Sequence, residues 1–194
     1  MGVAETDEAL MIRVASGDQR AFAELFDRYA PKVIRFAARF TQDAARAEEL
    51  SQEIFVKLFR TAKRYRPEAR FQTFLYRVAT NHCLNEVRRG EYRAPAKAGL
   101  EPDLDVSTSP DGPEDALWGR ELERTVFNAL AALSDRERAA FCMARFDGLS
   151  YREIACALGA SEPAVKSLIH RATMAVARKL SELQAGILPA RSRA

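Results

Sequence analysis

The sequence predicts an all-α protein made of two small helical domains joined by a flexible linker, with a helix-turn-helix in the second domain. Three observations lead to this prediction. Apolar residues recur at helical spacing through 21–40 and 47–65, and no segment alternates convincingly with the period of two typical of strands. Two capping boxes mark helix starts in the C-terminal half. Between the halves, residues 90–113 hold four prolines and three glycines without a helical period.

The division of the chain follows from that Pro/Gly-rich segment. It cannot bury enough apolar surface to offset the entropy lost in a packed core. We therefore predict an N-terminal domain at 1–90, a flexible acidic linker at 91–113, and a C-terminal domain at 114–194 that ends in a short frayed tail. With 194 residues, 47% of them hydrophobic, the chain is long enough for one sizeable core or two small ones.

The C-terminal domain contains the most informative pattern. Two pairs, Ser134 with Glu137 and Ser150 with Glu153, have the S/T-x-x-E spacing of a capping box. The helix that begins after Ser150 is about two turns long, because Gly159 suits a left-handed residue just past a helix end. A second helix follows within a few residues. Its predicted buried stripe is Val165, Ile169, Ala172, Val176 and Leu180. A short helix, a glycine turn and a second helix form a helix-turn-helix, whose second helix normally lies in a DNA major groove.

The opposite face of that second helix is polar and basic. The residues that we predict to contact duplex DNA are Ser161, Lys166, Ser167, His170 and Arg171. Lysine, arginine and serine side chains can donate to base edges or to phosphates. The alternative is that they are solvated residues of an ordinary amphipathic helix, but the upstream helix and the glycine turn favour DNA contact.

An acidic helix face is predicted in the N-terminal domain. Glu48, Glu49, Gln52 and Glu53 cluster on one side of a helix, and Phe55 is expected to be partly exposed among them. Negative charge is poorly placed for contact with phosphates, so we interpret this face as a protein-docking surface. A solvated helix face is the alternative.

Aromatic side chains are interleaved with arginine and asparagine in the next segment. The predicted contacts to unpaired DNA bases are Phe71, Phe74, Tyr76, Arg77, Asn81, Asn85, Arg88 and Arg89. Aromatic rings can stack on bases, while arginine and asparagine can hold the backbone and the base edges. Some of these rings must belong to the core, and we expect Phe71 or Phe74 to be buried.

Charge is unevenly distributed, although the net charge is only +3. From Lys57 to Arg93 there are ten basic residues against three acidic ones, and from Ala94 to Glu123 there are two against eight. From Pro163 to the end the balance is six basic against one acidic. Two basic regions separated by an acidic segment are typical of a protein that makes two contacts with a polyanion.

Several function classes are excluded. No apolar run approaches the roughly 20 residues that cross a bilayer, and the acidic N-terminus is unlike a signal peptide, so we expect a cytoplasmic protein without direct membrane insertion. Cys83, Cys142 and Cys156 lack paired spacing, which favours core packing over metal or redox chemistry. The acidic cluster has neither a histidine nor a phosphate-binding glycine loop beside it in the sequence. We therefore expect no enzymatic activity, cofactor or metal.

Residues 47–89, the proline-rich segment and residues 149–172 together resemble an extracytoplasmic-function (ECF) sigma factor of bacterial RNA polymerase, in the sigma-70 family. The resemblance covers nearly the whole chain. It implies that the first domain is sigma domain 2, which docks on the polymerase and melts and reads the minus-ten promoter element. The second is then sigma domain 4, which binds the minus-thirty-five element as duplex. By position, it implies docking by Glu49, Gln52 and Glu53, a base contact by Asn81, and minus-thirty-five contacts by Lys166, Ser167 and Arg171.

The chain departs from the common family pattern at a few positions. Phe74 stands where tryptophan is common, and Leu168 stands where a basic residue is common. Ala164 follows an unusual Pro163, where Gly-Thr is common. We expect Phe74 to stack or pack nearly as well as tryptophan, whereas Leu168 removes a polar contact and can change the promoter preference.

The resemblance also implies partners. These are core RNA polymerase, through the clamp helices of its largest subunit and its flap, promoter DNA, and an anti-sigma factor that holds the protein inactive until a stress or envelope signal. The sequence shows no inhibitory domain of its own. The alternative function is a helix-turn-helix transcription regulator that binds duplex DNA without being a polymerase subunit. Its response-regulator form would alternate strands and helices in the first half, and no such pattern is found.

Overall fold

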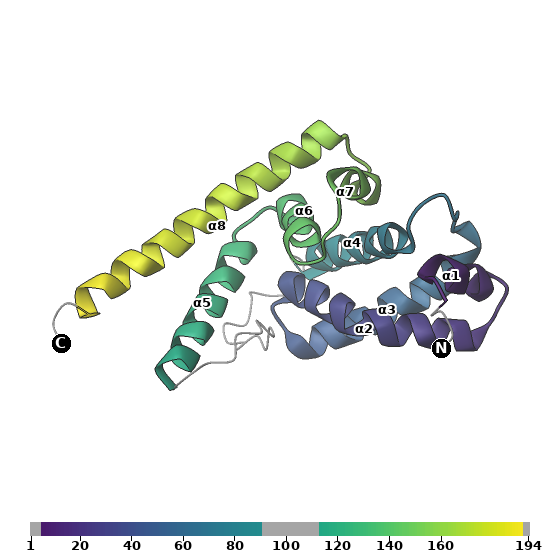
Figure 1. Cartoon of the computed structure of the whole chain (residues 1–194), viewed down its shortest axis with the longest axis horizontal. Helices are drawn as coiled ribbons and strands as arrows, with labels where there is room; N and C mark the ends of the chain where they lie inside the picture. The colour runs from purple at the N-terminus through teal and green to yellow at the C-terminus, as the bar shows by residue number, and fades with distance from the viewer. Residues whose placement is uncertain (1–4, 91–112, 192–194) are drawn as a thin grey trace.

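The computed structural model describes residues 5–90 and 113–191, apart from the side chains of residues 90, 113–118, 120 and 186–191 (Figure 1). The α-helices in these ranges are α1 (Asp7–Ala15), α2 (Gln19–Thr41), α3 (Ala44–Thr61), α4 (Phe71–Gly90), α5 (Pro113–Ala131), α6 (Asp135–Arg145), α7 (Tyr151–Leu158) and α8 (Glu162–Arg191), and a short 3-10 helix, η1 (Ala62–Arg64), follows α3. The all-α prediction is confirmed. The predicted flexible linker, up to residue 112, lies outside the described residues.

The N-terminal half is a bundle in which α2, α3 and α4 pack on one another and α1 packs on α2 (Figure 1). Two helix starts are capped locally, because the carboxylates of Asp18 and Asp43 accept hydrogen bonds from amides in the first turns of α2 and α3. The cap of α4 comes from a distant segment. Glu8 in α1 accepts a hydrogen bond from the Phe71 amide at 2.9 Å, which ties α1 to the start of α4.

The C-terminal half contains both predicted capping boxes. Glu137 Oε2 accepts from the Ser134 amide at 3.2 Å, and Glu153 Oε2 accepts from the Ser150 amide at 2.8 Å. Gly159 has a φ of 58° and ends α7 in the left-handed conformation, after 8 residues. The two-turn helix and its glycine turn are therefore confirmed.

The start of α8 also follows the prediction. Ser161 Oγ accepts a hydrogen bond from the Ala164 amide at 3.4 Å, and Pro163 lies in the first turn, where its missing N–H costs no hydrogen bond. The buried stripe consists of Val165, Ile169, Ala172 and Val176, with Leu180 partly buried. The helix is longer than the sequence predicts, because its 30 residues continue to Arg191 through the segment expected to fray.

The two halves of the molecule pack directly on each other. α7 lies beside α4 (Figure 1). α5 and α6 contact α2. The Gln72 side-chain amide donates to the carbonyl oxygen of Asp147 at 3.1 Å, and Arg70 Nη1 lies 3.2 Å from Glu153 Oε1. Buried apolar residues of both halves belong to one cluster. The chain therefore forms an interface between its halves that the sequence pattern does not reveal.

Among the described helices, none combines the length and the apolar character needed to cross a membrane. Cys83 and Cys142 are buried, as predicted, and burial raises the pKa of the Cys142 thiol to about 12. The prediction of core packing is wrong for Cys156, which is exposed. Its neighbours Ala155 and Ala157 take the buried side of α7, so Cys156 points away from the core of the C-terminal half.

Candidate functional site

Three surfaces gather the polar residues that the sequence singles out. We name them the acidic face of α3 (Glu48, Glu49, Gln52 and Glu53), the polar stripe of α4 (Arg77, Asn81, Asn85, Arg88 and Arg89) and the recognition face of α8 (Ser161, Lys166, Ser167, His170 and Arg171). Every one of these residues is exposed. The helical period therefore assigned their orientation correctly on all three helices.

Arg46, in the first turn of α3, organises the acidic face. Its Nη1 lies 2.9 Å from Glu49 Oε2 and 3.0 Å from Glu53 Oε1. Glu53 Oε2 also lies 2.8 Å from His82 Nε2 in α4. Partial burial acts to raise the pKa of Glu53, but hydrogen bonds from His82 and Arg46 outweigh it and lower that pKa. Glu53 is therefore tied into the fold, whereas Gln52 has no partner among the described residues.

The expectation that Phe55 is partly exposed on this face is wrong. Its side chain is 2% exposed and packs edge-on against Phe22 and Phe26, with the Phe26 ring centroid 4.7 Å away. The apolar residue that α3 presents beside the acidic face is Val56, which is 49% exposed and lines an open groove together with Glu49 and Gln52. Val56 was missed in the sequence, although it lies seven residues after Glu49 and therefore on the same side of the helix.

The aromatic residues predicted to meet unpaired bases belong to the core. Phe71 and Tyr76 are 0% exposed and Phe74 is 6% exposed, so both candidate phenylalanines are buried where one was expected. The Phe71 ring packs on Tyr29 and the Tyr76 ring on Phe36, with centroids 5.1 and 5.2 Å apart. In this arrangement, the predicted base contacts of Phe71 and Tyr76 are replaced by packing, because α4 is covered by α2 and α3 and by the C-terminal half.

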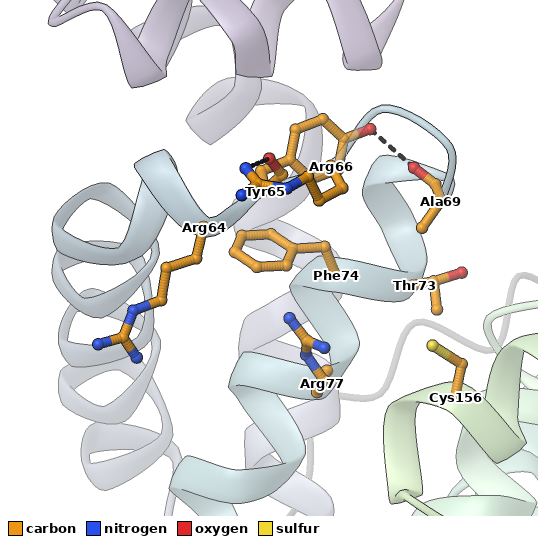
Figure 2. Close-up of a pocket in the computed structure, with 8 residues that line it drawn as sticks. All are labelled: Arg64, Tyr65, Arg66, Ala69, Thr73, Phe74, Arg77 and Cys156. Atoms are coloured by element: carbon orange, nitrogen blue, oxygen red, sulfur yellow. Dashed lines mark hydrogen bonds between the residues drawn. The ribbon is translucent and has the colours of Figure 1, made fainter.

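A small pocket of about 120 Å³ opens where η1, the start of α4 and α7 meet (Figure 2). Its lining consists of Arg64, Tyr65, Arg66, Ala69, Thr73, Phe74, Arg77 and Cys156. The Phe74 ring lies between Tyr65, with centroids 5.4 Å apart, and the Arg77 guanidinium, 5.3 Å from the ring centroid. The Tyr65 hydroxyl donates to the Ala69 carbonyl at 2.8 Å, which closes the turn before α4.

Arg77 contacts this aromatic pair, and Arg64 and Arg66 line the same pocket. Aromatic rings together with guanidinium groups suit a base with flanking phosphates. Arg64 and Arg66 were missed in the sequence, because η1 and the turn after it carry no helical period. Further along α4, Asn81, Asn85 and Arg88 line a second hollow. The polar stripe and the pocket thus form one continuous polar track along α4.

The recognition face of α8 combines free side chains with anchored ones. Lys166 and His170 are exposed and have no partner among the described residues. Ser167 Oγ donates to the Pro163 carbonyl at 3.1 Å, and Arg171 Nε lies 2.6 Å from Glu137 Oε1. The hydrogen bond from Arg171 lowers the pKa of Glu137. Arg171 therefore links α8 to α6, in addition to any contact with DNA.

The packing of α8 explains why an apolar residue, Leu168, stands where a basic residue is common. It is partly buried and packs against the core cluster. Within the part of the chain that the structure describes, no group of three histidine, cysteine or acidic side chains is placed to hold a metal ion.

Comparison with known proteins covers both halves of the chain. Residues 25–92 match the family model "Sigma-70 region 2", and residues 123–176 match "Sigma-70, region 4". The RNA polymerase sigma-H factor of Pseudomonas aeruginosa is 34% identical over an aligned length of 193 residues, and the alignment covers 92% of this chain and 96% of that protein. The ECF RNA polymerase sigma-E factor of Escherichia coli K12 is 31% identical over 189 residues, covering 92% and 96%.

Two solved structures share the fold. CnrH, in complex with the cytosolic domain of CnrY, superposes with a TM-score of 0.70 at 24% identity, covering 92% of this chain and 99% of that chain. The sigma factor RpoE of Bartonella quintana, in complex with the anti-sigma factor NepR, superposes with a TM-score of 0.66 at 18% identity, covering 82% and 96%. Together with the two family models and the relatives that match over most of the chain, these findings show that this protein belongs to the ECF sigma factors of the sigma-70 family, non-catalytic subunits that direct RNA polymerase to promoters.

Proposed function

We propose a separate partner for each of the three surfaces. The acidic face of α3 docks on core RNA polymerase, the polar stripe of α4 and its pocket read the single-stranded minus-ten element, and the recognition face of α8 binds the minus-thirty-five element as duplex. The corresponding domains are residues 1–90 for docking and melting, 91–113 for the linker, and 114–194 for duplex recognition.

The observation that carries this proposal is the separation of charge within the N-terminal half. Glu48 and Glu49 are exposed on α3, whereas Arg77 and Arg88 are exposed on α4. An acidic face repels phosphates and attracts a basic protein surface, and the exposed Val56 beside it adds apolar area. The basic stripe has the opposite preference. One small bundle can therefore hold a protein on α3 and a DNA strand on α4 at the same time.

The proposed partners are the clamp helices and flap of core polymerase, promoter DNA, and an anti-sigma factor that responds to a stress or envelope signal. Support for the last comes from the two structural neighbours, which were solved with CnrY and with the anti-sigma factor NepR. The alternative of a regulator outside the polymerase explains only the helix-turn-helix. It leaves the region 2 match at residues 25–92 unexplained.

In vitro transcription with core RNA polymerase and genomic DNA fragments tests the assignment. The chain is expected to support initiation at a defined set of promoters, and Gln52→Lys on the acidic face is expected to reduce initiation by weakening the binding of core polymerase. Gln184→Lys, the same change at an exposed position of α8 beyond its recognition face, serves as the matched surface control. If Gln52→Lys initiates as well as the control, α3 does not dock on the polymerase.

A further inference from the structure

The pocket in Figure 2 carries positive charge that the described residues leave unbalanced. Its lining includes the exposed side chains of Arg64, Arg66 and Arg77, and no acidic residue is among the described residues that line it. None of the three guanidinium groups forms an ion pair within the described part of the chain. The neighbouring carboxylate of Glu153 in α7 is already paired with Arg70, at 3.2 Å. The pocket is therefore suited to a small anion.

A buried hydroxyl in the lining of the same pocket also lacks a partner. Thr73 is 4% exposed, and its Oγ1 has no hydrogen-bond partner among the described residues. A buried polar group without a partner costs free energy, and a polar atom of a bound ligand offsets that cost. The rings of Tyr65 and Phe74 supply an apolar side. Apolar walls with a few convergent polar groups are typical of small-molecule sites.

Cys156 brings a nucleophile to this pocket. It belongs to α7 and is exposed, whereas Cys83 and Cys142 are buried. Figure 2 shows its sulfur directed towards α4. Burial keeps a structural cysteine inert, while an exposed thiol in electropositive surroundings is accessible to reagents. An anionic reagent is attracted by the same guanidinium groups that line the pocket. The thiol and the charge therefore favour the same class of ligand.

We propose that Cys156 is a site of reversible S-thiolation by a small disulfide that carries carboxylates, which the arginines of the pocket bind. The Cys156 thiol gives up its proton, and the thiolate attacks one sulfur of the disulfide. A new S–S bond forms to Cys156 and the S–S bond of the reagent breaks. The other half of the reagent leaves as a thiolate and takes up a proton. The reagent is reduced as Cys156 is oxidised, so no further oxidant is required.

The mixed disulfide places carboxylates beside α4 and on the first helix of the helix-turn-helix. Its effect on transcription rests on the proposed function, because both elements must then face DNA. Negative charge at this position repels the phosphates of the promoter. Thiolation therefore lowers initiation, and a reducing agent restores it.

The reaction rates of the full chain with two disulfides of opposite charge test the proposal. Glutathione disulfide carries carboxylates, whereas cystamine carries only ammonium groups. Mass spectrometry with peptide mapping gives each rate and the cysteine that reacts, and Cys156→Ser is the unreactive control. A peptide of residues 151–160, which lacks the pocket, gives the intrinsic ratio of the two rates. Arg66→Gln removes one charge from the pocket, and Arg20→Gln removes the same charge from an exposed position of α2.

The full chain is expected to react at Cys156 alone. Its ratio of the glutathione disulfide rate to the cystamine rate is expected to exceed that of the peptide by about tenfold. Arg66→Gln should lower this ratio by about threefold, whereas Arg20→Gln should leave it unchanged. A ratio equal to that of the peptide, or an equal loss in both variants, overturns the inference.

The effect on transcription has its own readout. The chain thiolated at Cys156 is expected to initiate about fivefold less than the reduced chain at a promoter found in the genomic assay, and reduction should restore initiation. Unchanged initiation by the thiolated chain overturns the regulatory consequence. If the reduced chain initiates at no promoter while Cys156 still shows the charge preference, the proposed function fails and the thiolation site stands, so the two failures are distinguishable.

Discussion

The two helices predicted to contact DNA differ in what surrounds them. The recognition face of α8 is open, and its opposite side packs on the C-terminal half through a single stripe. α4 is contacted by α2 and α3 and by α7. Consequently, Phe71 and Tyr76 are core residues and only a narrow polar stripe remains. The polar residues of both helices lie on the exposed side as predicted, whereas the aromatic residues of the more central helix α4 pack inward.

The largest effect expected from this comparison is on stability. Tyr76→Ala removes a fully buried ring from α4 and is expected to lower the free energy of unfolding by about 3–5 kcal/mol. Tyr76→Phe is the matched control, because it keeps the ring in the core and removes only the hydroxyl, which interacts with Asp147. Urea unfolding measures both. A loss below about 1 kcal/mol for Tyr76→Ala would mean that α4 is more exposed in solution than in this structure.

A third surface sharpens the comparison, because α3 is exposed like α8 but carries the opposite charge. Gln52→Lys is expected to weaken binding to core polymerase by about 2–5 kcal/mol if its site is buried in the complex. It should change the free energy of unfolding by no more than about 0.5 kcal/mol, since Gln52 has no partner in the fold. Titration of labelled chain with core polymerase gives the affinity.

Glu53→Lys is the less specific variant of the acidic face. It places a cation against Arg46 and His82, so a loss of polymerase binding comes together with a loss of stability. Comparison of the two variants separates docking from folding. If both variants bind the polymerase as tightly as the parent chain, the acidic face does not contact the polymerase and is only a solvated surface.

On α8, Lys166→Ala is expected to weaken sequence-specific duplex binding by about 1–3 kcal/mol if Lys166 contacts a base, with no change in stability. If Lys166 contacts a phosphate, binding to all sequences weakens alike and the salt dependence becomes less steep. Fluorescence anisotropy with promoter duplexes at two or more salt concentrations distinguishes these results. Arg171→Ala is a poorer test, because it also breaks the contact with Glu137.

The smallest expected effect is a pH dependence of the free energy of unfolding. It comes from Asp147, in the turn between α6 and α7 that contacts Gln72 of α4. Burial raises the pKa of Asp147, although Tyr76, Arg39, Lys32 and Arg35 act to lower it. An acid whose pKa is raised in the folded chain binds more protons there than in the unfolded chain, so the free energy of unfolding falls as the pH rises through that pKa. Urea unfolding of the full chain is expected to show this fall over that pH range. Asp147→Asn should remove the dependence, and an unchanged pH profile in that variant would assign it to another group.

The parts of the fold that could be predicted are those specified by nearby residues. Ser150 and Glu153 are three residues apart, and Gly159 ends α7 by its own backbone freedom, so both features are visible in the sequence. The cap of α4 could not be predicted, because Glu8 is 63 residues from Phe71. The contact of Gln72 with Asp147 spans 75 residues and was invisible for the same reason.

The residues of the candidate site also divide into those that the sequence could predict and those that it could not. The polar residues of all three surfaces could be assigned to exposed faces, since charged side chains are rarely buried. The aromatic residues could not, because Phe55, Phe71 and Tyr76 are equally compatible with stacking on a base and with packing on a ring. Arg64 and Arg66 join the pocket only through the turn that Tyr65 closes.

The central claim is that α4 acts on separated strands and α8 on duplex DNA, and footprinting of one promoter in complex with polymerase tests it most directly. Asn81→Ala is expected to reduce permanganate reactivity of unpaired thymines near the minus-ten element while DNase I protection at the minus-thirty-five element persists. Lys166→Ala is expected to reduce DNase I protection of the minus-thirty-five element at limiting polymerase. In the complexes that still form, the thymines near the minus-ten element are expected to react normally with permanganate. Normal thymine reactivity with Asn81→Ala and with Arg77→Ala, each otherwise folded and bound to polymerase, would contradict the account.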